Sequence, residues 1–241
     1  IALRAGDAVG AARAFQSVLA TGEYNPVIAE EYALLAAGQG RHRDALTVFE
    51  RLIEKQGEGN VAPSVLRAAG ECMLALRQTE PAKRLLHRIT RRDPDDAAAW
   101  VLLARAGIAT RDAQTTRTAA EQLRRLVPRD PQTLIIDAYA SLQEDRFATA
   151  RKSLEAALEL DGKDVLAHCM LGLVAERTDD LAAAREHYRA ALALDPDCVW
   201  ARSALARMGA STGQTRVTAT ESNDASAVHL AAGMEDIAPQ P

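Results

Sequence analysis

The chain has 241 residues, of which 48% are hydrophobic, 26% are charged and 4% are aromatic. These proportions are typical of a soluble folded protein, and the few aromatic residues favour close helix packing over a sheet core. The formal net charge of −4 argues against a nucleic-acid binder dominated by phosphate contacts, although a local basic face stays open.

No apolar run reaches the roughly 18–20 residues that span a bilayer, so we expect no membrane insertion. The sequence begins at Ile1 rather than at methionine and shows no signal peptide. We therefore expect either a processed product or a piece of a longer protein. Its compartment is left open: a soluble chain of this kind is either cytoplasmic or exported after processing.

A period of 34 residues runs through the sequence. Asp-Pro-Asp occurs around Pro94 and around Pro196, which lie 102 residues apart, three times 34. Windows that start at 63, 97, 131 and 165 align without a gap, and each predicts two amphipathic helices around a short turn. The aligned columns are Gly70, Ala104, Ala138 and Gly172; Leu86, Ala120, Leu154 and Tyr188; and Pro94, Pro128, Gly162 and Pro196.

This pattern resembles the tetratricopeptide repeat, a helix-turn-helix unit of 34 residues. Two residues depart from it, because Asp137 stands where leucine is expected and Thr116 where alanine is expected. The resemblance implies an all-α protein, a right-handed α-solenoid or superhelix of such repeats. The window that starts at Val165 matches best, through Leu171, Gly172, Ala184, Tyr188, Ala191 and Pro196.

In chain order, we expect a repeat array over 1–209, followed by a low-complexity tail over 210–241 that is rich in Ser, Thr, Ala and Gly. The array contains a half repeat and a trailing helix at its two ends. Its parts are the half repeat 1–25, the repeats 26–62, 63–96, 97–130, 131–164 and 165–198, and the trailing helix 199–209.

Proline punctuates the repeats because it ends the second helix of a unit. The aspartate that follows, Asp95 or Asp197, can accept a backbone N–H and cap the next first helix. Trp100 belongs to that packed first helix, whereas Trp200 lies two places earlier in its own unit. Glycine or alanine at the eighth place lets neighbouring helices approach closely.

No reaction centre is evident, so we expect no enzyme, no catalytic residue, no metal and no cofactor. The five histidines show no metal-binding spacing, and His168 and His187 are expected to be ordinary packed or exposed residues, although they share a unit. For Cys72, Cys169 and Cys198 we expect inert thiols on packed helices, with a disulfide or a metal site as the alternative.

The resemblance implies a concave groove lined by the second, fifth, ninth and twelfth places of the first helices. We expect a non-catalytic scaffold whose mostly apolar groove binds a protein or peptide segment. The alternative is that several of these residues pack against neighbouring helices. The predicted lining is Leu34, Arg67, Glu71, Leu74, Val101, Arg105, Ile108, Ile135, Tyr139, Leu142, Leu166 and Leu173, with Cys169 and Glu176 at the same places.

The second helices of two adjacent units are rich in arginine. These side chains either form a solvated outer face or bind an acidic partner segment. The clamp of lysine and asparagine found in chaperone-binding relatives is absent, which disfavours an acidic chaperone peptide as the partner. The arginines are Arg84, Arg88, Arg91, Arg92, Arg117, Arg124 and Arg125.

Two further hypotheses concern the ends of the chain. The tail segment 226–237 carries Val228, Leu230, Met234 and Ile237 beside two acids, so the tail is either disordered or docks in a groove of its own or a neighbouring chain. The incomplete end repeats predict head-to-tail stacking into a filament, with a plain helical cap as the alternative. This contact would use Ile1, Leu3, Trp200, Leu205 and Met208. An accessory segment of a larger enzyme or secretion protein is a third reading.

Overall fold

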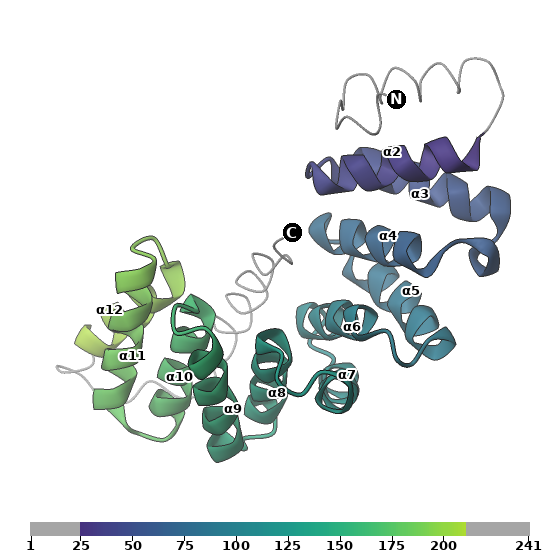
Figure 1. Ribbon diagram of the computed structural model, residues 1–241. Helices are drawn as coiled ribbons and strands as arrows, with labels where there is room; N and C mark the ends of the chain where they lie inside the picture. Colours follow the sequence, from purple (N-terminus) through teal and green to yellow (C-terminus); the bar gives the residue numbers. More distant parts are fainter. Residues whose placement is uncertain (1–24, 211–241) are drawn as a thin grey trace. The chain divides into compact units, whose positions relative to one another are not determined.

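The computed structural model describes residues 25–210, and every regular element within them is helical (Figure 1). The predicted all-α fold of helix-turn-helix repeats is confirmed. The first helices of the repeats are α2 (Pro26–Gly38), α4 (Pro63–Ala75), α6 (Ala97–Ala109), α8 (Pro131–Gln143), α10 (Val165–Arg177) and α12 (Val199–Ala210). The second helices are α3 (His42–Gln56), α5 (Thr79–Arg92), α7 (Ala113–Leu126), α9 (Phe147–Leu160) and α11 (Leu181–Leu194).

The chain divides into two compact units, one that ends at Ala106 and one that begins at Gly107. In the first unit, α3 packs between α2 and α4, and α4 pairs with α5. In the second unit, each helix from α7 to α12 packs on the next helix along the chain. A short 3-10 helix, η2 (Glu58–Asn60), lies in the lengthened loop before α4. The predicted tail lies outside the described residues apart from Ala210, which ends α12, and so does the predicted half repeat apart from Asn25.

The two helices of each pair are joined by a turn that has the same backbone conformation in all five pairs. The fifteenth residue of each predicted repeat is left-handed, with φ of 73° at Gly40, 61° at Arg77, 56° at Arg111, 55° at Asp145 and 62° at Asp179. Glycine adopts this conformation without steric strain, while the other residues reach it at a cost. The short turn is therefore imposed by the packing of the two helices.

Aspartate side chains begin several first helices. Asp130 Oδ2 accepts from Thr133 N at 2.8 Å, and Asp164 Oδ1 accepts from Ala167 N at 2.8 Å. At α6 the cap is Asp96, whose Oδ1 accepts from Ala99 N at 3.0 Å. The expected cap, Asp95, was wrong by one residue because the Asp-Pro-Asp segment closes its own turn, in which Asp95 N donates to Asp93 Oδ1 at 3.2 Å.

The proline carbonyl at each Asp-Pro-Asp segment receives a hydrogen bond from the next first helix. Trp100 Nε1 donates to Pro94 O at 2.8 Å, and Arg202 Nη2 donates to Pro196 O at 2.7 Å. Each donor lies six residues after its proline, so Arg202 is the counterpart of Trp100. Trp200 is instead packed, with 5% of its surface exposed.

Both departures from the repeat pattern are accommodated by a local partner. Thr116 is fully buried and its Oγ1 donates to Asp112 O at 3.0 Å. Gly107 leaves room for the Thr116 side chain, because a Cβ on residue 107 would lie 2.7 Å from Thr116 Oγ1. The buried Asp137 accepts from Ser153 Oγ at 2.8 Å, and its Oδ1 lies 3.3 Å from Arg124 Nε.

Candidate functional site

The predicted groove residues of the first unit differ in how much of their surface is accessible. Leu34 on α2 is 38% exposed, whereas Leu74 on α4 is 6% exposed. Glu71, Val101 and Arg105 are half-buried. Leu34 therefore presents apolar surface, while Leu74 belongs to the packed interior.

Arg67, another predicted groove residue of this unit, is engaged within the chain. Its Nη1 forms an ion pair with Asp96 Oδ2, and the other carboxylate oxygen of Asp96 caps α6. The pair connects the fifth residue of one repeat to the residue that precedes the next first helix. Arg67 therefore couples adjacent repeats as well as lining the predicted surface.

In the second unit the predicted groove residues form an apolar set on the first helices that is nearly all buried. Leu142 is half-buried, and Cys169 is 1% exposed. Tyr139 OH accepts from Gln143 Nε2 at 3.3 Å, and burial raises the pKa of Tyr139, so the hydroxyl stays protonated at neutral pH. The remaining members are Ile108, Ile135, Tyr139, Leu166 and Leu173, with 2%, 1%, 4%, 7% and 5% exposed.

Glu176 links the last three helices of the described part of the chain. Tyr188 OH on α11 donates to Glu176 Oε1 at 2.5 Å, and Arg207 Nη2 on α12 lies 3.5 Å from Glu176 Oε2. Burial, and then the carboxylate of Glu176, raise the pKa of Tyr188. The phenol therefore remains a hydrogen-bond donor, and Glu176 acts as a structural junction of α10, α11 and α12.

Several arginines on the second helices or directly before them bind acids of the chain itself. Arg88 Nε and Nη2 donate to the two carboxylate oxygens of Glu58, each at 2.8 Å, and this contact raises the pKa of Arg88. Arg117 and Arg146 both pair with Glu144, beside a hollow of about 260 Å³. The sequence hypotheses for the arginines were a solvated outer face or a site for an acidic partner. Both missed a third role, which is ion pairing within the repeat array.

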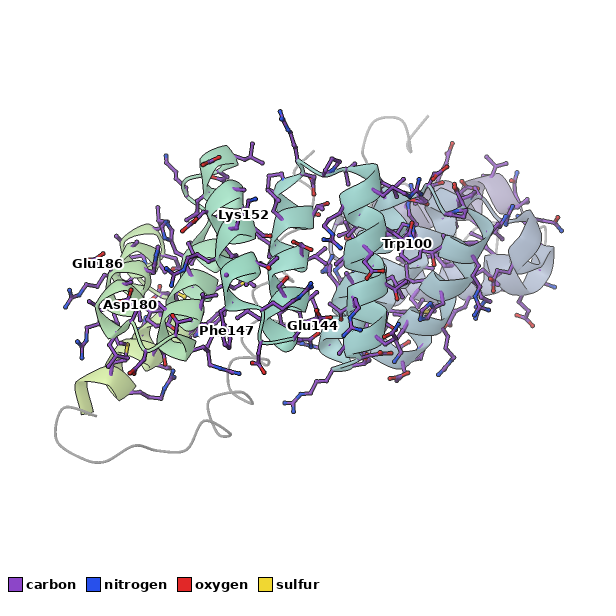
Figure 2. The ribbon with its side chains drawn as sticks, turned by 90° about the horizontal axis from the view of Figure 1, so that it is seen from below. Trp100, Glu144, Phe147, Lys152, Asp180 and Glu186 are labelled. Carbon is purple, nitrogen blue, oxygen red and sulfur yellow. The ribbon has the colours of Figure 1, made fainter. Side chains whose placement is uncertain are left out.

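A second hollow, of about 270 Å³, lies at the start of α9 and combines an aromatic ring with basic groups. The Arg177 guanidinium lies 5.6 Å from the ring centroid of Phe147, and its Nη2 donates to Asp145 Oδ1 at 2.9 Å. Figure 2 shows Phe147 near one end of α9 and the exposed Lys152 farther along the same helix. Arg151 and Thr178 complete this rim, joined by a hydrogen bond of 3.4 Å.

Leucines at the ends of three second helices form a feature that the sequence hypotheses missed, which we call the outer apolar row: Leu126, Leu160 and Leu194. They end α7, α9 and α11; Leu126 is half-buried, while Leu160 and Leu194 are 53% and 38% exposed. Val199, at the start of α12, is 57% exposed. The signal was present in the sequence as leucine at the thirtieth place of three consecutive repeats.

Some of the residues predicted for the end contacts lie outside the described residues, and others lie on α12. Ile1, Leu3, Val228, Leu230, Met234 and Ile237 lie outside the described residues. On α12, Trp200 and Met208 are each 5% exposed and Leu205 is half-buried. Trp200 and Met208 are thus part of the packing of this helix on the repeat before it.

The second unit contains two pairs of potential metal ligands, and the two members of each pair lie close together. His168 Nδ1 lies 3.4 Å from His187 Nδ1, and Cys169 Sγ lies 3.6 Å from Cys198 Sγ. Within residues 25–210, no group of three or more histidine, cysteine or acidic side chains is arranged to hold a metal ion. In the same range, no helix has the length and apolar character that crossing a membrane requires.

Comparison with solved structures finds the same fold. MamA of Desulfovibrio magneticus RS-1 is 16% identical, with a TM-score of 0.62 over 71% of this chain and 95% of its own. TTC0263, a thermophilic TPR protein of Thermus thermophilus, is 21% identical, with a TM-score of 0.58 over 75% and 99%. YrrB, described as a TPR protein with an unusual peptide-binding site, is 15% identical, with a TM-score of 0.61 over 79% and 96%.

Sequence comparison identifies the family. No curated protein sequence matches this chain. Tetratricopeptide repeat families match residues 36–106 in one case and residues 1–63 and 138–197 in another. The second match alone spans more than half of the 241 residues. The chain therefore belongs to the tetratricopeptide repeat family.

Proposed function

We propose that this protein is a non-catalytic interaction scaffold that binds a protein segment on the first helices of its second unit. The observation that carries the proposal is the chemistry of that surface. Ile135, Tyr139, Leu142, Leu166 and Leu173 are all apolar or aromatic, at the places that face the groove in this family. Of these five, Leu142 is half-buried, while Ile135, Tyr139, Leu166 and Leu173 are 1%, 4%, 7% and 5% exposed, so a bound segment would reach them from the edge that Leu142 forms.

The preferred segment would be apolar. Buried alkyl and aromatic side chains offer no charge to a partner, so the affinity would come from burial of apolar surface. The fold of the chain is shared with YrrB, which is described as having a peptide-binding site, and this similarity supports the same class of function here. The chain's own segment 226–237 has this chemistry, and we propose it as a resident or competing ligand.

A titration tests this function. A labelled peptide of residues 226–237 is added to a variant that lacks residues 212–241, and fluorescence anisotropy follows binding. We expect saturable binding with Kd on the order of micromolar, and weaker binding of the same peptide to the full chain because its own tail competes. Absence of binding to the shortened chain would contradict the proposal for this ligand.

A matched pair of variants locates the site. Leu142→Asp places a charge on the half-buried edge of the proposed surface, and Leu160→Asp places one on an exposed residue of a second helix. We expect the first to weaken peptide binding by about tenfold or more and the second to leave it unchanged. Circular dichroism of both variants checks that the helices are retained.

We propose self-assembly as a second function, favoured by the exposed residues of the outer apolar row and by Val199. Leu160, Leu194 and Val199 are 53%, 38% and 57% exposed, and exposed apolar side chains favour association. Leu160 and Leu194 lie on α9 and α11, so they would support a side-by-side contact between chains, while Val199 on α12 would support a head-to-tail contact. Light scattering over a range of concentrations tests this association. We expect the mass of the wild-type chain to rise with concentration and the double variant Leu160→Glu/Leu194→Glu to have a lower mass. A monomer whose mass does not change with concentration would contradict the proposal.

A further inference from the structure

Cys169 and Cys198 occupy a register that joins neighbouring repeats elsewhere in the chain. Cys169 is the fifth residue of its repeat and Cys198 directly precedes α12. Three repeats earlier in the same register, Arg67 and Asp96 stand at the corresponding places, 102 residues before each cysteine, and form an ion pair. The two sulfur atoms therefore meet where an inter-repeat link is built into the first unit.

The two thiols lie close enough to each other to be considered for a disulfide bond. Cys169 Sγ lies 3.6 Å from Cys198 Sγ, which is van der Waals contact for two sulfur atoms. A disulfide bond is about 2.05 Å long, so the two sulfur atoms would have to approach by about 1.5 Å to form one. We propose that Cys169 and Cys198 form a reversible redox modification site, whose disulfide ties the start of α12 to α10.

The two thiols differ in accessibility, which sets the order of reaction. Cys198 is half-buried and directly precedes the N-terminus of α12. Cys169 is 1% exposed, and burial followed by the neighbouring Cys198 raises the pKa of its thiol. Cys198 is therefore the thiol that meets a reagent from solution, and Cys169 is the resolving thiol.

The chemistry is exchange with a low-molecular-weight disulfide such as oxidised glutathione. The Cys198 thiolate attacks one sulfur of the reagent, forms a mixed disulfide and releases one reduced thiol. Cys169 then loses its proton and attacks the Cys198 sulfur, which releases the second reduced thiol. Two cysteine thiols are oxidised by two electrons, and one reagent disulfide is reduced to two thiols.

The bond would restrain the last described helix. The noncovalent contacts of α12 with the repeat before it include Arg207 Nη2 with Glu176 and Arg185 Nη2 with the carbonyl of Met208 at 3.3 Å. Terminal helices of repeat arrays contact a neighbour on one side and open more readily than internal ones. A covalent link from α12 to α10 would suppress this opening, and reduction would restore it.

Cys72 provides an internal comparison. Its Sγ lies 3.7 Å from His42 Nδ1, and burial raises the pKa of the Cys72 thiol to about 11. It belongs to the first unit, while the proposed pair belongs to the second. A Cys72→Ser variant should therefore oxidise in the same way as the wild-type chain.

The test incubates the full chain in glutathione buffers of increasing oxidation, followed by intact-mass analysis and peptide mapping. We expect the mass to fall by two hydrogen atoms, through a Cys169–Cys198 link that dithiothreitol reverses, in both wild type and Cys72→Ser. Hydrogen exchange of residues 199–210 should slow by about tenfold or more in the oxidised chain. The folded chain should hold the disulfide about tenfold more strongly than the urea-unfolded chain, because folding already brings the thiols together.

Variants at the pair keep the test decisive. In Cys169→Ala, a stable glutathione adduct should accumulate on Cys198, and in Cys198→Ser neither the link nor the slower exchange should appear. If Cys169→Ala fails to fold, Cys198→Ser reports the same loss from a half-buried position. A lasting glutathione adduct on Cys198 of the folded wild-type chain, a link through Cys72, or equal disulfide stability in folded and unfolded chains would overturn the proposal.

Discussion

Tyr188 packs its ring directly against Gly172. The tyrosine is fully buried, and a Cβ placed on residue 172 would lie 2.6 Å from Tyr188 Cε1 and 2.7 Å from Cζ. The glycine belongs to α10 and the tyrosine to α11, so their contact sets how closely the two helices of this repeat approach. The same places in the second repeat hold Gly70 and Leu86, where the corresponding distance to Leu86 Cδ2 is 3.1 Å.

We predict that Gly172→Ala destabilises the second unit. The new methyl group overlaps the Tyr188 ring, and the hydroxyl of that ring is held by Glu176, so the ring has little freedom to move. Overpacking of this kind costs about 1–3 kcal/mol, partly offset by about 1 kcal/mol of helix propensity. Urea unfolding measures the difference. The control is Gly209→Ala on α12, where nothing lies within 4 Å of a new Cβ, and an equal loss there would contradict the packing argument.

A second prediction concerns the turn between α2 and α3. Gly40 has φ of 73°, so Gly40→Ala should destabilise the first unit by about 1–2 kcal/mol through left-handed strain. Gly38→Ala is the control, since Gly38 ends α2 without positive φ and nothing lies within 4 Å of a new Cβ. Thermal unfolding compares the two variants. If both change the melting temperature equally, the turn conformation has no special role.

A third prediction tests the buried carboxylate of α8. Asp137→Leu supplies the leucine that the family pattern has at this place, yet we expect a loss of about 1–3 kcal/mol because Ser153 Oγ loses its acceptor. Ser153→Ala should be less damaging in the Asp137→Leu background than in the wild type. A double-mutant cycle followed by urea unfolding should give a coupling of about 0.5 kcal/mol or more. Additive effects would show that the two side chains do not depend on each other.

A fourth prediction concerns pH. Burial, and then the charge of His168, lower the pKa of His187 below its ordinary value of 6.5. Below about pH 6.5 the unfolded chain therefore binds more protons at this residue than the folded chain, and the free energy of unfolding falls as the pH falls. Above this pH the full stability is present. His187→Gln should flatten this part of the stability profile measured by urea unfolding, and an unchanged slope in the variant would contradict the assignment.

The sequence predicted the fold well because the repeat period and the helix punctuation are local signals. The helices α8 and α10 begin at residues 131 and 165, which are the starts of two aligned windows. The pattern also indicated the small residue at Gly172 and the large one at Tyr188. These features depend on spacing alone, and a fixed spacing determines which residues of a helix pair face each other.

The candidate site was harder to predict because the repeat register indicates which side of a helix a residue lies on, but not how much of its side chain is exposed. Leu34 and Leu173 hold groove places on their respective first helices, but they are 38% and 5% exposed. The cap at Asp96 and the pairing of Arg117 with Glu144 depend on turn geometry and on side chains that reach into the next repeat. A linear pattern contains neither of these.

The most direct measurement of the central claim is hydrogen exchange on the chain that lacks residues 212–241, with and without saturating peptide 226–237. We predict slower exchange in α8 and α10, where the apolar groove residues lie, and unchanged exchange in α9 and α11. Protection confined to α9 and α11, or no change in α8 and α10 at saturating peptide, would contradict the assignment of the first helices as the binding surface.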